Sequence, residues 1–134
     1  MPNVAIDDYH ELLALHRLIL AAKFGEAALE GPLHGSSLIA AIAERVLAAL
    51  IEADCTRDGP VAAERWRVWR QLDPSRREWK VAVQRASECA RWDDWSEAER
   101  VGYSELVLAP FILPDELRDS FLAQVTTSRR PPRA

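Results

Sequence analysis

Two histidines near the start of the chain have the residue type of a metal ligand without the required spacing. His10 is followed by Glu11, and His16 comes six positions after His10. The zinc-protease pattern needs histidines four apart, so that both reach one ion from one helical face. Asp7 and His10 match the carboxylate–histidine spacing of di-iron bundles, but the glutamates that could complete such a site fall on predicted polar faces. We therefore expect no metal, no cofactor, and a buried, hydrogen-bonded His16.

The cysteines and glycines form no recognisable catalytic motif. Cys55 and Cys89 each stand alone, without CxxC spacing and without a base placed to activate the thiol. The glycine-containing stretch 25–35 lacks the preceding strand and the GK[ST] ending of a phosphate-binding loop. The sequence thus predicts no catalytic residue, and lone cysteines favour a reduced, cytoplasmic chain.

The apolar stretches are too short for a membrane protein. Each is interrupted before the roughly 18 residues that a membrane span requires, and residues 1–10 carry two aspartates and no basic group. We expect neither membrane insertion nor secretion. The Ala- and Arg-rich composition favours a bacterial source.

One segment, residues 64–95, combines aromatic and basic side chains. It holds all five tryptophans of the chain: Trp66, Trp69, Trp79, Trp92 and Trp95. Residues 60–91 carry eight basic and four acidic groups, a net charge of +4, between acidic flanks of −5 (1–59) and −6 (92–128). Trp and Arg are the residue types most enriched at binding hot spots, because both offer large buriable area with directional bonding. The segment therefore predicts a surface that docks a macromolecular partner.

The candidate binding residues lie on the two helices of this segment. Val81, Arg85 and Trp92 share one side of the predicted helix 74–91, where they would form an exposed apolar and basic strip. Replacing Arg85 and Trp92 together should then abolish partner capture and leave the fold intact. The candidate surface is completed by Arg65, Arg70, Trp66 and Trp69. In a competing interpretation the tryptophans on apolar helix faces, including Trp66 and Trp69, belong to the core.

Arg65 has two interpretations, because it falls on the apolar side of its helix. A charge in that place is costly unless it is paired or escapes to solvent. Its stem could cover the edge of the core while its head reaches water. Alternatively, the head pairs with an acidic group such as Asp93, Asp94 or one on the first helix, in which case truncation costs more stability than truncation of a surface arginine.

The residues that break the helical pattern predict an all-α fold, a single compact domain of five or six helices in bundle-like or orthogonal packing. Only five glycines occur among 134 residues, and Ser96 with Glu99 forms a capping box. The expected helices span residues 8–24, 36–54, 60–72, 74–91, 96–108 and 115–125, with Asp7 and Ser36 or Ser37 as the first two caps. The third and fourth should form a hairpin. The domain is expected to cover residues 1–127, with 128–134 as a disordered basic tail.

Three classes of function fit these features. The first is a non-catalytic helical interaction or regulatory module, of adaptor or inhibitor and immunity type, that docks another protein through the Arg/Trp-rich hairpin. The second is a nucleic-acid-binding regulator that uses the basic hairpin and the RRPPR tail, although the acidic flanks would repel phosphate. The third is a small helical enzyme or ligand-binding bundle with a pocket of Trp, Arg65 and His16. Surplus apolar residues on helix 96–108 also suit a homodimer contact.

Overall fold

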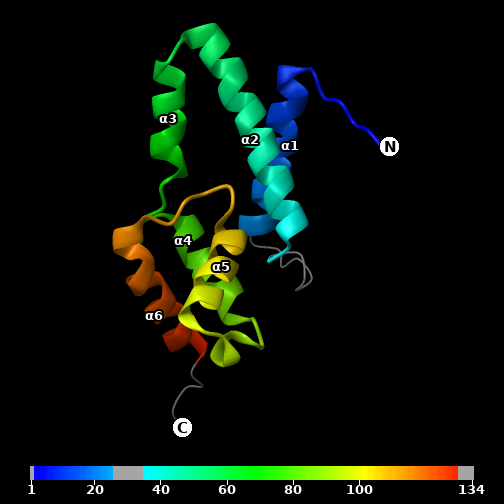
Figure 1. Ribbon diagram of the computed structural model, residues 1–134. Helices are drawn as coiled ribbons and strands as arrows, with labels where there is room; N and C mark the ends of the chain where they lie inside the picture. The colour runs from blue at the N-terminus through cyan, green and yellow to red at the C-terminus, as the bar shows by residue number, and fades with distance from the viewer. Residues whose placement is uncertain (1, 26–34, 130–134) are drawn as a thin grey trace.

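Six α-helices contain most of the chain in the computed structural model, which describes residues 2–25 and 35–129 (Figure 1). They are α1 (Tyr9–Phe24), α2 (Ser37–Asp58), α3 (Val61–Arg70), α4 (Arg77–Ser87), α5 (Glu97–Leu108) and α6 (Arg118–Arg129), with short 3-10 helices η2 (Trp92–Asp94) and η3 (Asp115–Leu117). The one extended pairing among the described residues is an isolated bridge between Gln71 and Ile112. The predicted all-α class is confirmed. None of the helices described is long and apolar enough to cross a membrane.

The helix starts follow the capping residues. Asp8 caps α1 by accepting a hydrogen bond of 3.0 Å from the amide of Glu11, one residue after the predicted cap at Asp7. The Ser36 hydroxyl caps α2. At α5 the predicted capping box is confirmed, since Ser96 and Glu99 exchange hydrogen bonds of 3.1 and 3.2 Å. Each cap satisfies amides that the first helical turn leaves without an intrahelical partner.

Helix α2 continues four residues past the predicted end at Asp54 and stops at Gly59, a residue type that favours a helix end. Gly59 has φ of +82°, a left-handed conformation that glycine adopts without the steric cost of a Cβ. Its amide donates to the carbonyl of Cys55 at 2.8 Å and closes the last turn. The extra turn keeps Asp54 inside the helix, where its carboxylate reaches Trp66 and Arg57.

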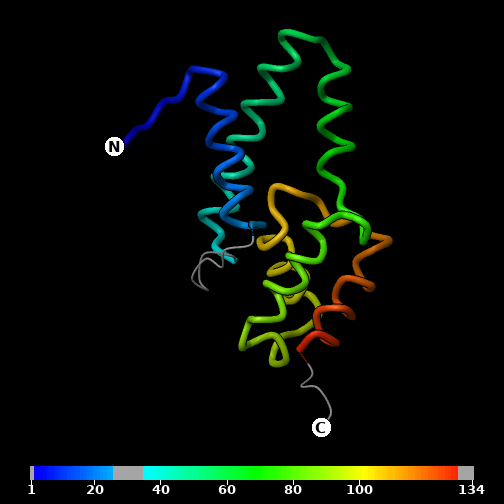
Figure 2. Tube along the Cα trace, turned by 180° about the vertical axis from the view of Figure 1, so that it is seen from behind, coloured from blue at the N-terminus to red at the C-terminus, as the bar shows by residue number. Residues whose placement is uncertain are grey.

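The helices pack in two groups that share one core. In the first group α2 lies between α1 and α3, and in the second α4 packs against α5 and α6 (Figures 1 and 2). Phe24 at the end of α1 and Leu72 after α3 enter the core of the second group, so the two groups are joined. The largest fully buried side chains of that core include Trp79, Trp92, Leu108 and Phe121. The prediction of a single compact domain is therefore confirmed.

The predicted hairpin of the third and fourth helices is wrong. Helix α3 packs on α2, whereas α4 packs on α5 and α6. Leu72, between them, is buried, and its amide donates to the carbonyl of Ile112 at 3.1 Å, while the Ile112 amide donates to Arg70 at 2.7 Å. This pairing with the chain after α5 separates the two helices, a long-range contact that the Asp73-Pro74 turn signal does not encode.

Helix α4 ends at Ser87, four residues before the predicted end at Arg91. The Ser87 hydroxyl donates to the carbonyl of Gln84 at 2.7 Å, a local side-chain bond of the kind that competes with helix continuation. Trp92 consequently starts the separate helix η2. Ala82 and Ala86 are fully buried on the inner face of α4.

At the other end of the chain, α6 continues through Arg129, two residues beyond the predicted domain boundary at 127. The Arg129 guanidinium donates to the carbonyl of Ser87 at 2.7 Å and pairs with Asp93 at 3.1 Å. These bonds anchor the last turn of α6, so residues 128 and 129 belong to the folded domain. The rest of the predicted tail, 130–134, lies outside the described residues.

Candidate functional site

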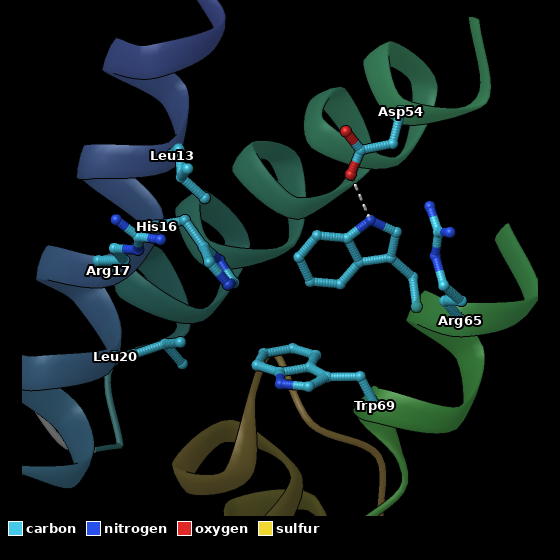
Figure 3. Close-up of a pocket in the computed structure, with 8 residues that line it drawn as sticks. Leu13, His16, Arg17, Leu20, Asp54, Arg65 and Trp69 are labelled. Carbon is cyan, nitrogen blue, oxygen red and sulfur yellow. Dashed lines mark hydrogen bonds between the residues drawn. The ribbon is translucent and has the colours of Figure 1, made fainter. Parts of the chain in front are cut away.

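A groove between α1 and α3, with α2 behind it, is the candidate site (Figure 3). Its volume is about 450 Å³, within the range of about 300–1,000 Å³ usual for ligand sites. The groove opens to solvent and is not an enclosed cavity. We call it the indole groove, and its lining residues are Leu13, His16, Arg17, Leu20, Asp54, Arg65, Trp66 and Trp69.

The aromatic rings of the groove form one contiguous cluster. The Trp66 and Trp69 centroids lie 5.2 Å apart in an edge-on arrangement. The His16 ring lies 5.6 Å from Trp66 and 5.3 Å from Trp69. Beneath the groove Trp69 rests on the buried ring of Phe111, 4.6 Å away. Edge-on and offset contacts suit the quadrupoles of these rings, so the half-buried indoles are held in place before any ligand arrives.

Asp54 fixes the orientation of Trp66. The buried carboxylate accepts a hydrogen bond of 2.8 Å from the Trp66 indole N–H and one of 2.9 Å from the Arg57 guanidinium. Figure 3 shows the indole bond reaching from α2 to α3. Because each oxygen already has a partner, Asp54 acts as a positioning residue.

His16 contributes an uncharged wall. The side chain is buried, as predicted, and it contacts aromatic rings. The predicted hydrogen bond is not found, because the imidazole has no partner among the residues that the structure describes. Burial, with a smaller contribution from the charge of Arg17, lowers the pKa of His16 below its ordinary value of 6.5. The imidazole is therefore neutral at neutral pH and resembles the apolar surfaces around it.

Two arginines flank the groove on opposite sides (Figure 3). Arg17 on α1 is exposed and has no ion pair with any acidic residue that the structure describes. Arg65 on α3 pairs with Asp58 at 3.0 Å, and 60% of its side chain is exposed. The predicted pairing of Arg65 with Asp93, Asp94 or the first helix is wrong, because α3 packs on α2 and brings Arg65 to the end of that helix.

Replacing Arg65 with alanine is expected to lower the free energy of unfolding by less than about 1 kcal/mol, because exposed ion pairs contribute little against solvent screening. Urea denaturation of the variant beside Arg67→Ala, which removes another exposed pair on α3, provides the measurement. The two losses should be similar. A loss for Arg65→Ala more than about 2 kcal/mol above that of Arg67→Ala would show a buried role for its charge.

The predicted exposed strip of Val81, Arg85 and Trp92 is absent. Trp92 is 0% exposed and donates to the Thr126 hydroxyl at 3.1 Å. Arg85 is buried and donates to the carbonyl of Gly25 at 3.0 Å, while Val81 packs on the core. The strip assumed one continuous helix through residue 91, and the end of α4 at Ser87 removes that assumption.

Arg70 also lies outside the groove. Its guanidinium donates to the carbonyl of Pro110 at 2.9 Å and pairs with Glu44 at 2.6 Å. It therefore ties α3 to α2 and to the chain after α5. Of the predicted binding residues, the structure brings together Arg65, Trp66 and Trp69.

Five lining residues were not among the predicted binding residues, and of these His16 alone was named in the hypothesis of a ligand pocket. Leu13 and Leu20 lie on the apolar side of α1, which is wide enough to contact α2 with one part and line the groove with another. Arg17 borders that face, but a single basic residue there gives no specific signal. Asp54 was expected at a helix end, so nothing in the local pattern indicated its bond to Trp66.

The groove combines apolar and aromatic surfaces with polar groups. Its described lining includes two guanidinium groups, the Asp54 carboxylate and the His16 imidazole. Cys55 and Cys89 are reduced and half-buried outside it. Among the described residues no three His, Cys, Asp or Glu side chains are grouped to hold a metal ion.

Comparison with protein-family models, curated proteins and solved structures finds no match to this chain.

Proposed function

We propose that the protein is a non-catalytic interaction module, of adaptor or inhibitor type, that binds a partner protein in the indole groove. The observation that carries the proposal is the pair of indoles, Trp66 and Trp69, held rigidly at an open groove with arginines on both sides. Trp and Arg dominate binding hot spots, and rigid anchors lose little conformational entropy when a partner docks.

The open shape of the groove favours a macromolecule over a small ligand. Small-molecule sites usually enclose about 70–90% of the ligand surface. A groove between two helices, with a third behind it, is instead suited to a partner helix that places one apolar face against the lining. The partner then covers the indoles from outside, as an O-ring of surrounding contacts excludes water from a hot spot.

A small-ligand protein is the second candidate. The groove volume of about 450 Å³ and the presence of Trp66, Trp69, Arg65 and His16 in one lining support it. A compound that co-purifies with the native protein and is displaced by Leu13→Gln would favour this candidate over the first.

The nucleic-acid hypothesis is weaker than the sequence suggested, because several basic groups of segment 60–91 bond within the protein. Arg70, Arg76, Arg77 and Arg85 all donate to backbone carbonyls. Titration of labelled DNA or RNA at two salt concentrations tests what remains, since phosphate contacts make affinity fall with salt.

The interaction proposal is tested with two matched variants of α1. Leu13 lines the groove, whereas Leu18, 65% exposed on the same helix, does not. We expect a protein captured from the native host by the wild type and by Leu18→Gln to lose at least about tenfold in affinity with Leu13→Gln, because the substitution introduces a polar group at the hot spot. Quantitative mass spectrometry identifies the partner, and calorimetry gives the affinities.

Circular dichroism provides the control for folding of both variants. Equal capture by Leu13→Gln and Leu18→Gln would place the interface elsewhere, and the absence of any captured protein would contradict a module that works by binding one.

A further inference from the structure

We infer that the partner presents an amphipathic helix with acidic residues beside its apolar anchors, an inference that rests on the proposed function. The apolar part of the match follows from Leu13, Leu20 and the two indoles. The acidic part follows from the charges around them.

The groove has more positive charge than its own carboxylates neutralise. Arg17, Arg57 and Arg65 lie in or beside the groove, against the carboxylates of Asp54 and Asp58. Asp54 is bonded to Trp66 and Arg57, and Asp58 is shared between Arg57 and Arg65. Both acids are therefore occupied, in a chain whose overall charge is −4.

The positive excess is directed towards solvent. Arg17 is exposed without a described acidic partner, and the side chains of Arg57 and Arg65 are 59% and 60% exposed. A guanidinium offers five N–H donors, so an arginine that donates to one carboxylate can also donate to a second. Acidic side chains on a partner complement this potential and also speed association, whereas basic side chains would be repelled.

The spacing of the lining residues matches two turns of a partner helix. Leu13, His16, Arg17 and Leu20 lie at i, i+3, i+4 and i+7 of α1, a span of about 10 Å at 1.5 Å per residue. On α3 the lining residues are Arg65, Trp66 and Trp69. A partner helix with apolar anchors one turn apart fills the space between these faces. Acidic residues on either side of the anchors then reach Arg17 on one wall and Arg65 on the other.

A displayed peptide library tests the inference on the full-length protein. The probe is a phage library of 14-residue helices with two leucine anchors one turn apart and randomised flanking positions. Selection on the wild type, followed by removal of clones that also bind Leu13→Gln, isolates groove binders. We expect Asp and Glu at the flanking positions of the selected helices. Replacing them with Asn and Gln should weaken binding at least about tenfold, a size set by several charge pairs acting together.

Charge reversal on the protein provides the matched control. Arg17→Glu is expected to weaken the selected acidic helices by about tenfold, whereas Lys80→Glu, an equal change of charge at an exposed position on α4, should alter affinity by less than about twofold. Selected helices with neutral or basic flanks, or unchanged affinity in Arg17→Glu, would overturn the acidic-helix inference while the groove still binds. Failure to select any helix that distinguishes the wild type from Leu13→Gln would contradict the proposed function itself.

Discussion

Alanine in place of Trp92 is expected to lower the free energy of unfolding by about 3–5 kcal/mol, the range measured for large aromatic residues removed from cores. Trp92 is 0% exposed within the core that α4, α5 and α6 share. The substitution removes the packing of the ring and also leaves the Thr126 hydroxyl without its bond from the indole N–H. The guanidinium of Arg100, whose central carbon lies 5.4 Å from the ring centroid, loses a cation–π contact as well.

Urea denaturation of Trp92→Ala and Trp92→Phe separates these contributions. Phenylalanine keeps much of the apolar volume and loses the N–H donor, so its cost should be about 1–2 kcal/mol. A loss of 3–5 kcal/mol is a large part of the stability of a typical domain, about 5–15 kcal/mol. Melting temperatures that stay unchanged for both variants would restore the sequence-based interpretation, in which Trp92 is a surface residue.

The sequence was a good guide to the helices because their signals are local. The capping box of Ser96 and Glu99, the serine at the start of α2 and the glycine at its end act within a single helical turn. Amphipathic spacing likewise indicates buried helix faces, such as the face of α4 that buries Ala82 and Ala86. The errors at Asp8 and Ser87, of one and four residues, lie where polar side chains bond the terminal backbone groups, and the error at Asp58 lies where α2 continues to Gly59.

The arrangement of the helices could not be predicted from such signals. The hairpin of α3 and α4 was inferred from a proline turn, but the direction of the chain after α3 depends on the pairing of Leu72 with Ile112, forty residues later. Likewise, the binding strip on α4 required a helix that continued to Trp92. Trp92 lies beyond the helix end at Ser87, and on α4 itself Val81 packs on the core while Arg85 bonds to the end of α1.

The basic residues of segment 60–91 illustrate the same limit. The sequence predicted that this segment offers its basic side chains to a partner, whereas the structure bonds several of the guanidinium groups to carbonyls at helix ends. Arg77 and Arg85 donate to the carbonyls of Phe24 and Gly25, where α1 ends, at 2.5 and 3.0 Å. Cations are favoured there because the last carbonyls of a helix have no intrahelical donors and carry partial negative charge. The donor and acceptor residues of these two bonds are 53 and 60 positions apart in the sequence, so no local pattern predicts them.

The sequence predicted some of the residues of the candidate site, but it did not predict which helices meet there. A pocket of Trp, Arg65 and His16 was one of three hypotheses, and the structure brings those residues together in the indole groove. The hypothesis did not include α2. Asp54 on this helix orients Trp66, and the packing of α2 against both α1 and α3 brings their side chains into one groove. Residues on three helices converge only after the fold is complete, so the strongest sequence signal, the density of Trp and Arg, identified α3 and missed α1.

Lys23 is a second residue whose role only the structure reveals. Its side chain is 2% exposed, and its amine donates to the carbonyl of Leu106 at 2.9 Å and to that of Ala109 at 2.5 Å. It thereby connects the end of α1 to the end of α5. Burial lowers the pKa of Lys23 from 10.5 to about 8, against a smaller opposite effect of the Glu44 charge.

The stability of the protein is therefore expected to rise with pH between about 8 and 10.5. In this interval the amine of Lys23 is mostly neutral in the folded chain and mostly protonated in the unfolded chain. Because the unfolded state binds more protons, the free energy of unfolding increases as the pH rises. A shift of this size corresponds to about 3 kcal/mol. Both carbonyl bonds survive deprotonation, because a neutral amine keeps two N–H donors.

The measurement is urea denaturation at pH 7 to 10.5 for the wild type, Lys23→Met and Lys80→Met. Burial raises the pKa of Tyr103, which opposes the rise near pH 10, and subtracting the Lys23→Met curve removes that contribution. We expect the increase in the wild type and in Lys80→Met, which removes an exposed amine, and its absence in Lys23→Met. Parallel curves for all three proteins would mean that Lys23 reaches water, since an exposed lysine loses its proton over the same pH range in the folded and unfolded chains. Such a lysine could not link α1 to α5 from inside the core.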